Sequence, residues 1–247
     1  MPRIGTRKLY HILYHELKKI GVGRDRLFAI VKANHLDIVP KRQYHITTNS
    51  HHRFRKHKNL LESVTILRPE QVWVSDITYI GTRANPMYLS LVTDAYSKKI
   101  MGFNVSQSLN ACGAVAALEQ AIANRTHLKK HLIHHSDRGL QYCCDAYQTI
   151  LEKHKISCSM TESYDPYQNA VAERVNGILK HEFILGITIR DLDLMNKLID
   201  ESIYIYNNER PHWSCRMETP IKMHQQNTIK IRTYKNKNST ESKPDAI

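Results

Sequence analysis

The chain has 247 residues, enough for one sizeable domain and a small second one. Hydrophobic residues make up 41% and charged residues 24% of the sequence, values that exclude a disordered chain and are typical of a globular protein. No apolar run approaches the roughly 20 residues that span a bilayer, and the start does not resemble a secretory leader, so we expect a cytoplasmic protein without a membrane partner. Five scattered cysteines without a CxxC pair favour reduced thiols.

The net charge of +13 is concentrated in the first part of the chain. Residues 1–68 hold 15 Lys and Arg against 4 Asp and Glu, whereas residues 69–247 hold 21 against 19. A basic arm can neutralise phosphates, so this polarity predicts a nucleic-acid partner for a nearly neutral body. A solvated basic face is the alternative interpretation.

Residues 1–36 are predicted to form a helical hairpin that resembles part of a helix-turn-helix. Apolar residues recur at helical spacing between residues 6 and 20, and a Gly-Val-Gly turn leads to Asp25, a suitable N-cap. We expect the second helix to turn three residues inward: Leu27, Ile30 and Val31. An ordinary helical hairpin fits the pattern equally well.

Residues 37–68 lack clear periodicity and indicate a basic linker or DNA-binding arm. The positively charged Arg53, Arg55 and Lys56 are its expected DNA contacts. Residues 227–247 have a similar composition and predict a basic flexible tail.

Residues 69–226 form the predicted body of the protein. Runs rich in β-branched and aromatic residues alternate with turn signals, and alanine-rich or amphipathic stretches follow. The expected strands are 71–80, 87–93, 100–105 and 132–134, and the expected helices are 111–123 and 170–183. Three antiparallel strands followed by alternating helix and strand predict the α/β class: a mixed five-stranded sheet flanked by helices, on the ribonuclease-H-like plan.

Two acidic residues occupy positions that indicate a site on this sheet. Asp76 lies inside the first expected strand, where an interior carboxylate is costly unless it is paired or binds a cation. Asp137 follows the expected strand 132–134, at the edge where binding crevices open in α/β sheets. Each could instead be an ordinary cap or turn residue.

A third carboxylate, Glu173, lies on the last of these helices. At helical spacing it shares a polar face with Asn169, Asn176 and Lys180, a set suited to a metal-bound phosphate and expected to contact DNA. A solvated helix surface is the ordinary explanation. Asp94, near the end of the second strand, is interpreted as structural.

The motifs WVSDITYI, HHSDRGLQY and NAVAERVNGILKHE, followed by YNNERPH and TP, resemble the integrase catalytic core of insertion-sequence transposases. More narrowly, the chain resembles the downstream-frame product of the third insertion-sequence family, within the retroviral-integrase superfamily. The resemblance implies that Asp76, Asp137 and Glu173 are the catalytic and metal-binding triad and that Lys180 touches DNA. The chain departs from the family at Gln168, where many relatives have aspartate, and at Trp213, usually a small residue.

The implied activity is DNA transposition by 3′-end cleavage and strand transfer. Two Mg²⁺ ions, for which Mn²⁺ can substitute, suit this chemistry because hard cations prefer oxygen ligands. We expect Asp76 to bridge both ions and Asp137 and Glu173 to complete one shell each. Zinc is disfavoured because the histidines lack CxxC partners. His134 and His135 could line the site, or they could instead pack or contact the DNA backbone.

Element ends and target DNA are the implied partners. Synapsis of two ends also implies a homo-oligomer, and the family's upstream-frame product is an expected fusion or partner. Two other functions stay open: a catalytically silent DNA-binding fragment, and a nuclease on the same ribonuclease-H-like fold. The nuclease is disfavoured because the resemblance continues into YNNERPH and TP.

Overall fold

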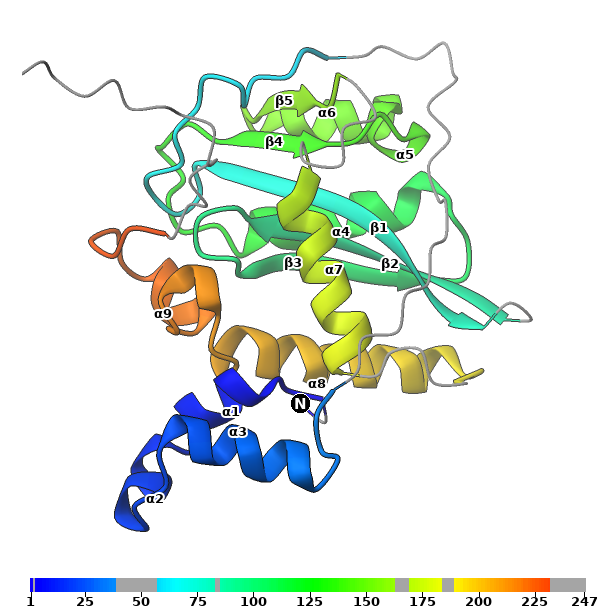
Figure 1. The fold of residues 1–247 in the computed structure, drawn as a ribbon. Coiled ribbons are helices and arrows are strands. Elements are labelled where there is room, and N and C mark those ends of the chain that lie inside the picture. The colour runs from blue at the N-terminus through cyan, green and yellow to red at the C-terminus, as the bar shows by residue number, and fades with distance from the viewer. Residues whose placement is uncertain (2, 39–56, 83–84, 163–168, 184–188, 232–247) are drawn as a thin grey trace, which may run out of the picture.

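The computed structural model describes residues 1, 3–38, 57–82, 85–162, 169–183 and 189–231. Figure 1 shows a central sheet with helices on both faces and the N-terminal helices at one end. The strands are β1 Val72–Thr82, β2 Asn85–Asp94, β3 Ile100–Ser106, β4 Ile133–Ser136 and β5 Ser157–Met160. The helices are α1 Thr6–Ile12, α2 Tyr14–Lys19, α3 Arg24–Ala33, α4 Ala111–Ala123, α5 Leu140–Cys143, α6 Asp145–Lys153, α7 Ala170–Glu182, α8 Leu192–Asn208 and α9 Pro220–His224.

The five strands form one mixed sheet in the order β3-β2-β1-β4-β5. β1, β2 and β3 are antiparallel neighbours, whereas β4 runs parallel to β1 and β5 runs parallel to β4. The predicted meander, the mixed sheet and its five strands are therefore confirmed. The long β1 is rich in β-branched and aromatic residues, which suit a pleated, covered surface.

One face of the sheet packs against α4, α5 and α6. The core of this layer includes Trp73, Ile77 and Val92 from the sheet and Leu118 from α4. Gly102 lets α4 approach closely, because a Cβ there would lie 2.1 Å from the carbonyl oxygen of Ala117. Helix α4 spans the predicted residues 111–123, where its alanines provide high helix propensity and a flat packing surface.

The other face is covered by α7 and α8. Figure 1 shows α7 crossing the sheet over β1 and reaching α8 at its far end. Leu89 and Leu91 from β2 pack there with Val175 and Leu179 from α7. Helix α8 begins after Asp191, whose Oδ1 accepts a 2.7 Å hydrogen bond from the Leu194 amide and satisfies one free amide of the first turn.

The N-terminal hairpin has a small core of its own: Leu17, Leu27 and Val31. The predicted first helix is broken at Leu13 into α1 and α2. Two details of the prediction were wrong. Asp25 lies in the first turn of α3, and Gly23 is the N-cap. Ile30 is 42% exposed, because the hairpin is too thin to cover a third residue.

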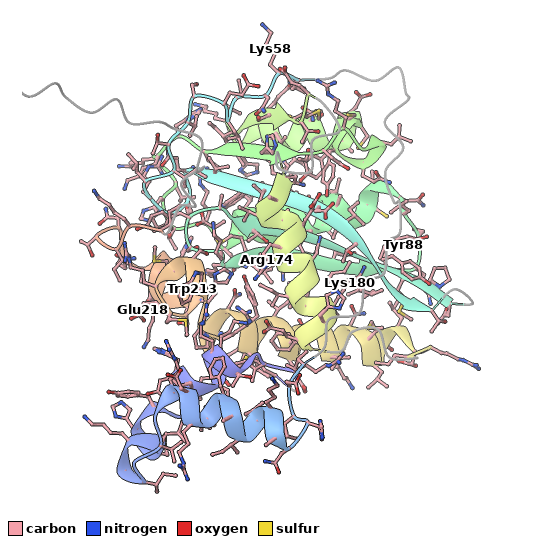
Figure 2. The ribbon with its side chains drawn as sticks, viewed as in Figure 1. Lys58, Tyr88, Arg174, Lys180, Trp213 and Glu218 are labelled. Carbon is pink, nitrogen blue, oxygen red and sulfur yellow. The ribbon has the colours of Figure 1, made fainter. Side chains whose placement is uncertain are left out.

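The hairpin is held to the body by polar contacts. The Nζ of Lys8 lies 2.7 Å from Oε1 of Glu182, at the end of α7. Arg210 reaches the same carboxylate through Nε at 2.7 Å and Nη2 at 2.8 Å. The guanidinium of Arg7 lies 4.9 Å from the ring centroid of Trp213, which Figure 2 labels. The large Trp213 therefore contributes a cation–π contact between the hairpin and the body.

The described part of the expected basic arm, residues 57–68, begins beside β5 and continues onto the core layer that contains Val72 and Ile133. The Leu60 amide donates to Oγ of Ser159 at 2.9 Å, and the Met160 amide donates to the carbonyl of Lys58 at 3.3 Å. Arg53, Arg55, Lys56 and Gln168, and the tail beyond residue 231, lie outside the described residues. Within the described part of the chain, no helix is long and apolar enough to cross a membrane.

Candidate active site

Asp76 lies in the middle of β1, opposite Leu91 of β2. It shares the face covered by α7 with Val74 and Ile80, so its carboxylate enters a partly buried layer between sheet and helix. The neighbouring β-branched and aromatic residues favour a strand strongly enough that it forms although it includes the polar Asp76.

Asp137 directly follows β4, as predicted. The parallel register pairs Val74 with His135, and two further residues along each strand bring Asp137 level with Asp76. Its Oδ1 accepts a 3.0 Å hydrogen bond from the Gly139 amide, which fixes the turn into α5. Two acidic residues far apart in sequence therefore lie level with each other on adjacent strands, Asp76 within β1 and Asp137 just after β4.

Glu173 is an exposed residue in the first turn of α7. Helix α7 packs on β1, so its first turn carries this third carboxylate toward the other two. Three of the four residues predicted for the apolar stripe of this helix are buried: Val175, Ile178 and Leu179. The fourth, Val171, is partly buried.

The three carboxylates influence one another electrostatically. Burial raises the pKa of Asp76 to about 7, the negative charges of Asp137 and Glu173 add to this shift, and a hydrogen bond from Asn176 opposes it. Burial and the charge of Asp137 also raise the pKa of Glu173. Burial lowers the pKa of Lys180, while the charge of Asp76 opposes that change. The three acidic side chains thus lie near enough to influence one another, with the Lys180 cation near Asp76.

Two asparagines connect α7 to β1. The Nδ2 of Asn176 donates to Oδ2 of Asp76 at 2.7 Å, and the Nδ2 of Asn169 donates to the carbonyl of Ser75 at 3.0 Å. Both side chains are buried, with exposed fractions of 4% and 6%. Asn169 is the residue before the helix and not part of its polar face. A DNA contact by either amide stays a prediction.

The chemistry of these donors fits a hard divalent cation. All three acidic side chains offer carboxylate oxygens, and the buried Oδ1 atoms of Asn169 and Asn176 have no hydrogen-bond partner among the described residues. In the same part of the chain, no three His, Cys, Asp or Glu side chains are close enough together to hold a metal ion. Mutual repulsion keeps like charges apart, so drawing them together requires a positive charge between them.

His134 and His135 pack in the core and are fully buried. The Nε2 of His134 lies 2.7 Å from Oγ of Ser75 and 2.8 Å from the hydroxyl of Tyr147. His135 contacts Oγ of Ser159 through Nδ1 at 2.8 Å. These contacts support the packing interpretation for both histidines.

Asp94 is a structural residue, as predicted. It is fully buried and accepts hydrogen bonds from the amides of Glu70, Tyr96 and Ser97. These bonds close the turn between β2 and β3 and tie it to the residues before β1.

Sequence reasoning did not single out Glu70, whose carboxylate is buried among Thr126, His127 and His224.

Two family models that are both described as integrase core domain match residues 67–166 and 154–220. The chain is 35% identical to an uncharacterized 31 kDa protein of insertion element IS600 from Shigella sonnei, over 86% of this chain and 80% of that protein. It is also 33% identical to transposase InsF of insertion sequence IS3A from Escherichia coli strain K12, over 64% of this chain and 55% of InsF. The chain belongs to the insertion-sequence transposases of the IS3 family.

Solved structures support the same fold. The catalytic core of HTLV-2 integrase in complex with magnesium superposes with a TM-score of 0.51 at 20% identity and covers 64% of this chain and 98% of that core. A chain of the simian T-cell lymphotropic virus intasome gives a TM-score of 0.55 at 19% identity, over 97% of this chain and 81% of the other. This transposase therefore has the ribonuclease-H-like fold. The integrase core domain that the family models match is a polynucleotidyl transferase core, a class that generally uses divalent metal ions.

Proposed function

We propose that this transposase acts through Asp76, Asp137 and Glu173 as a DDE-type catalytic triad. The observation that carries the proposal is that three elements distant in sequence, β1, the end of β4 and the first turn of α7, present carboxylates whose charges perturb one another. Perturbed carboxylates gathered near the carboxyl end of a strand in an α/β sheet, as near the end of β4 here, are a frequent sign of a functional site. A mere surface charge cluster would not place Asp76 in a partly buried position beneath α7.

Mg²⁺ is the proposed cofactor, bound by these three carboxylates. When bound, two hard cations activate an oxygen nucleophile and neutralise the charge of the phosphate. Asn176 orients the Asp76 carboxylate through Oδ2, and the Gly139 amide orients that of Asp137 through Oδ1. The chain itself therefore fixes the direction of two carboxylates before any ligand arrives.

The reaction has two steps that use one site. In cleavage, a water oxygen attacks the phosphorus at an element end, the bond from phosphorus to the 3′ oxygen breaks, and a 3′-hydroxyl is released. In strand transfer, that hydroxyl oxygen attacks a phosphodiester of the target and displaces another 3′ oxygen. The second step is a transesterification that conserves the number of phosphodiester bonds, so it needs no external energy source.

DNA at the element ends and in the target is the proposed substrate. Lys180 lies on α7 one helical turn from Asn176, and Figure 2 shows both Lys180 and Arg174 along this helix. A cation at this position can contact a phosphate near the triad. The basic residues Arg53, Arg55 and Lys56 precede the described residues 57–68 in the sequence and would extend the DNA interface. We propose residues 1–68 as the DNA-binding part.

The active form is proposed to be a homo-oligomer that joins two element ends, with the upstream-frame product as a fusion or a separate partner. The chain spans little more than half of InsF, so the relatives have room for further segments. Because the proposed DNA contacts are made by charged side chains, the affinity for DNA should fall steeply as the salt concentration rises.

The proposal is tested with DNA that carries the element's own ends, labelled at the strand to be cleaved. The protein, alone and with the upstream-frame product, is incubated with a target plasmid in Mg²⁺ or in EDTA. Joining of the labelled 3′ end to the target only with Mg²⁺ would support the transposase assignment. Cleavage of an RNA–DNA hybrid without joining would favour a nuclease, and DNA binding without any cleavage would favour a silent fragment.

A further inference from the structure

An aromatic cluster lies behind the acidic site. Tyr142, five residues after Asp137, is only 3% exposed. Its ring meets that of Tyr147 edge to face, with centroids 5.4 Å apart and an angle of 83° between the planes, and it lies 6.3 Å from the His134 ring. Such edge-to-face packing fixes both the position and the tilt of a buried ring.

The neighbours of Tyr142 are themselves held in place. Nε2 of His134 is within hydrogen-bond distance of both Ser75 and Tyr147, which links β4 to β1 and α6. Burial, and then the charge of His135, lower the pKa of His134 to about 3, so this ring stays neutral at physiological pH. The cluster therefore gives Tyr142 a rigid and uncharged support.

The hydroxyl of Tyr142 is buried without a hydrogen-bond partner among the residues that the structure covers. Three other buried tyrosines behave differently: Tyr147 meets His134, Tyr206 donates to the carbonyl of Lys98, and Tyr96 donates to that of Ile229. A buried hydroxyl that lacks a partner costs about 1–3 kcal/mol. Phenylalanine would fill the same space without this cost, so the hydroxyl needs another explanation.

Tyr142 lies next to the acidic site. A Cβ placed on Gly139 would be 3.0 Å from Oδ1 of Asp137 and 3.6 Å from Cδ2 of Tyr142, so both groups border the same point. Burial and the charges of Asp76 and Asp137 hold the pKa of Tyr142 well above its usual value. The hydroxyl therefore keeps its proton and can act as a hydrogen-bond donor, on a ring whose edge borders the Asp137 carboxylate.

We propose that Tyr142 is a positioning residue of the active site, whose hydroxyl donates a hydrogen bond to a water on the divalent cation held by Asp76 and Asp137. The inference rests on the proposed function. The Tyr142 hydroxyl is shielded from bulk solvent, so a bulky DNA phosphate cannot reach it. A water is the small acceptor that fits. Groups that hydrogen-bond to the ligands of a metal orient those ligands and strengthen the binding of the metal.

The test compares wild type with Tyr142→Phe and the control Tyr147→Phe, both as the full chain. Mn²⁺ alone is titrated by calorimetry, and melting temperatures are measured in EDTA. Tyr142→Phe is expected to bind Mn²⁺ about 10-fold more weakly, the lower end of typical outer-shell effects, with an unchanged or higher melting temperature. Tyr147→Phe, which removes a bonded hydroxyl from the same cluster, is expected to lower the melting temperature and leave Mn²⁺ affinity unchanged.

Wild-type affinity for Mn²⁺ in Tyr142→Phe would overturn the inference while the proposed triad stands. A lowered melting temperature or loss of folding in Tyr142→Phe would overturn it too, because the hydroxyl would then have a structural role. If Asp137→Asn binds Mn²⁺ as tightly as wild type, the metal is bound elsewhere, and the proposed triad fails together with the inference.

Discussion

The side-chain amide of Asn176 on α7 donates a 2.7 Å hydrogen bond to Oδ2 of Asp76 on β1. This bond directly links the helix that carries Glu173 to the Asp76 side chain of β1. It favours the ionised form of a carboxylate that burial and neighbouring charges push toward protonation. Asn176 thus acts on both the geometry and the charge of the site.

Asn176→Ala is expected to raise the pKa of Asp76 further above about 7, because the hydrogen bond that opposes the shift is lost. The change should be roughly one pH unit, the size of one charge-assisted hydrogen bond. A pH titration of the Asp76 carboxyl by NMR measures it. Asn208→Ala serves as the control, since Asn208 is exposed and bonds only within α8. An unchanged or lowered pKa in Asn176→Ala would contradict this account.

The raised pKa of Asp76 predicts a pH-dependent stability. The unfolded group ionises near 3.8 and the folded group near 7, so between these values the folded state binds more protons. The contribution of Asp76 to stability should therefore fall as pH rises from about 4 to 7. Asp76→Asn should remove this slope and gain about 1–3 kcal/mol relative to wild type at pH 7, a figure discounted for partial exposure. Urea unfolding of wild type and Asp76→Asn in EDTA at about pH 4 and pH 7 checks this prediction. The same change in stability with pH in both proteins would argue against a raised pKa of Asp76.

Glu182→Gln is expected to destabilise the protein by about 3–5 kcal/mol. Burial raises the pKa of Glu182, but its hydrogen bonds and ion pairs with Arg210 and Lys8 outweigh burial and lower it overall. Arg210 is 1% exposed, so removing the carboxylate charge leaves a buried cation uncompensated. Thermal unfolding measures the effect, with the exposed Glu209→Gln as the control. Equal melting temperatures for the two variants would be incompatible with a buried ion pair.

Substitution of two glycines should change stability in opposite directions. Gly102 lies in β3 against α4, and Gly177 lies in α7 on the other side of the sheet. Gly102→Ala should cost about 1–3 kcal/mol, because its Cβ would meet backbone atoms of Ala117 and Ala121 at 2.1 Å and 2.6 Å. Gly177→Ala in α7 should gain about 0.5–1 kcal/mol, because a Cβ there meets nothing within 4 Å and alanine favours a helix. Chemical denaturation distinguishes them, and a Gly102→Ala variant as stable as wild type would disprove the close approach of α4.

Much of the fold could be predicted from local pattern. Strand β1 and helix α4 match the predicted positions closely, because dense β-branched residues and an alanine-rich run give strong local signals. The placement of Asp76 within a strand and of Asp137 after one also followed from the sequence. Integrase relatives support the predicted family and fold, whereas the roles of single site residues stay predictions.

Other features could not be predicted because they depend on contacts between distant segments. Nothing local indicates that Glu182 receives both Lys8 and Arg210, or that Asn176 turns inward to Asp76. Helical spacing placed Asn176 on a polar surface, but a buried carboxylate across the interface draws it inside. For Tyr142 a weak signal existed, since it belongs to the HHSDRGLQY motif, but its orphaned hydroxyl is visible only in the packed structure.

The central claim is best tested by measuring DNA binding and strand joining together in Asp76→Asn, Asp137→Asn and Glu173→Gln, with Asp145→Asn as a control acidic residue outside the site. If the three carboxylates hold the catalytic ions, each triad variant should bind element-end DNA with near wild-type affinity and lose joining by at least about 1,000-fold, about 4 kcal/mol of transition-state stabilisation. Asp145→Asn should keep full activity. Wild-type joining by any one triad variant would contradict the account.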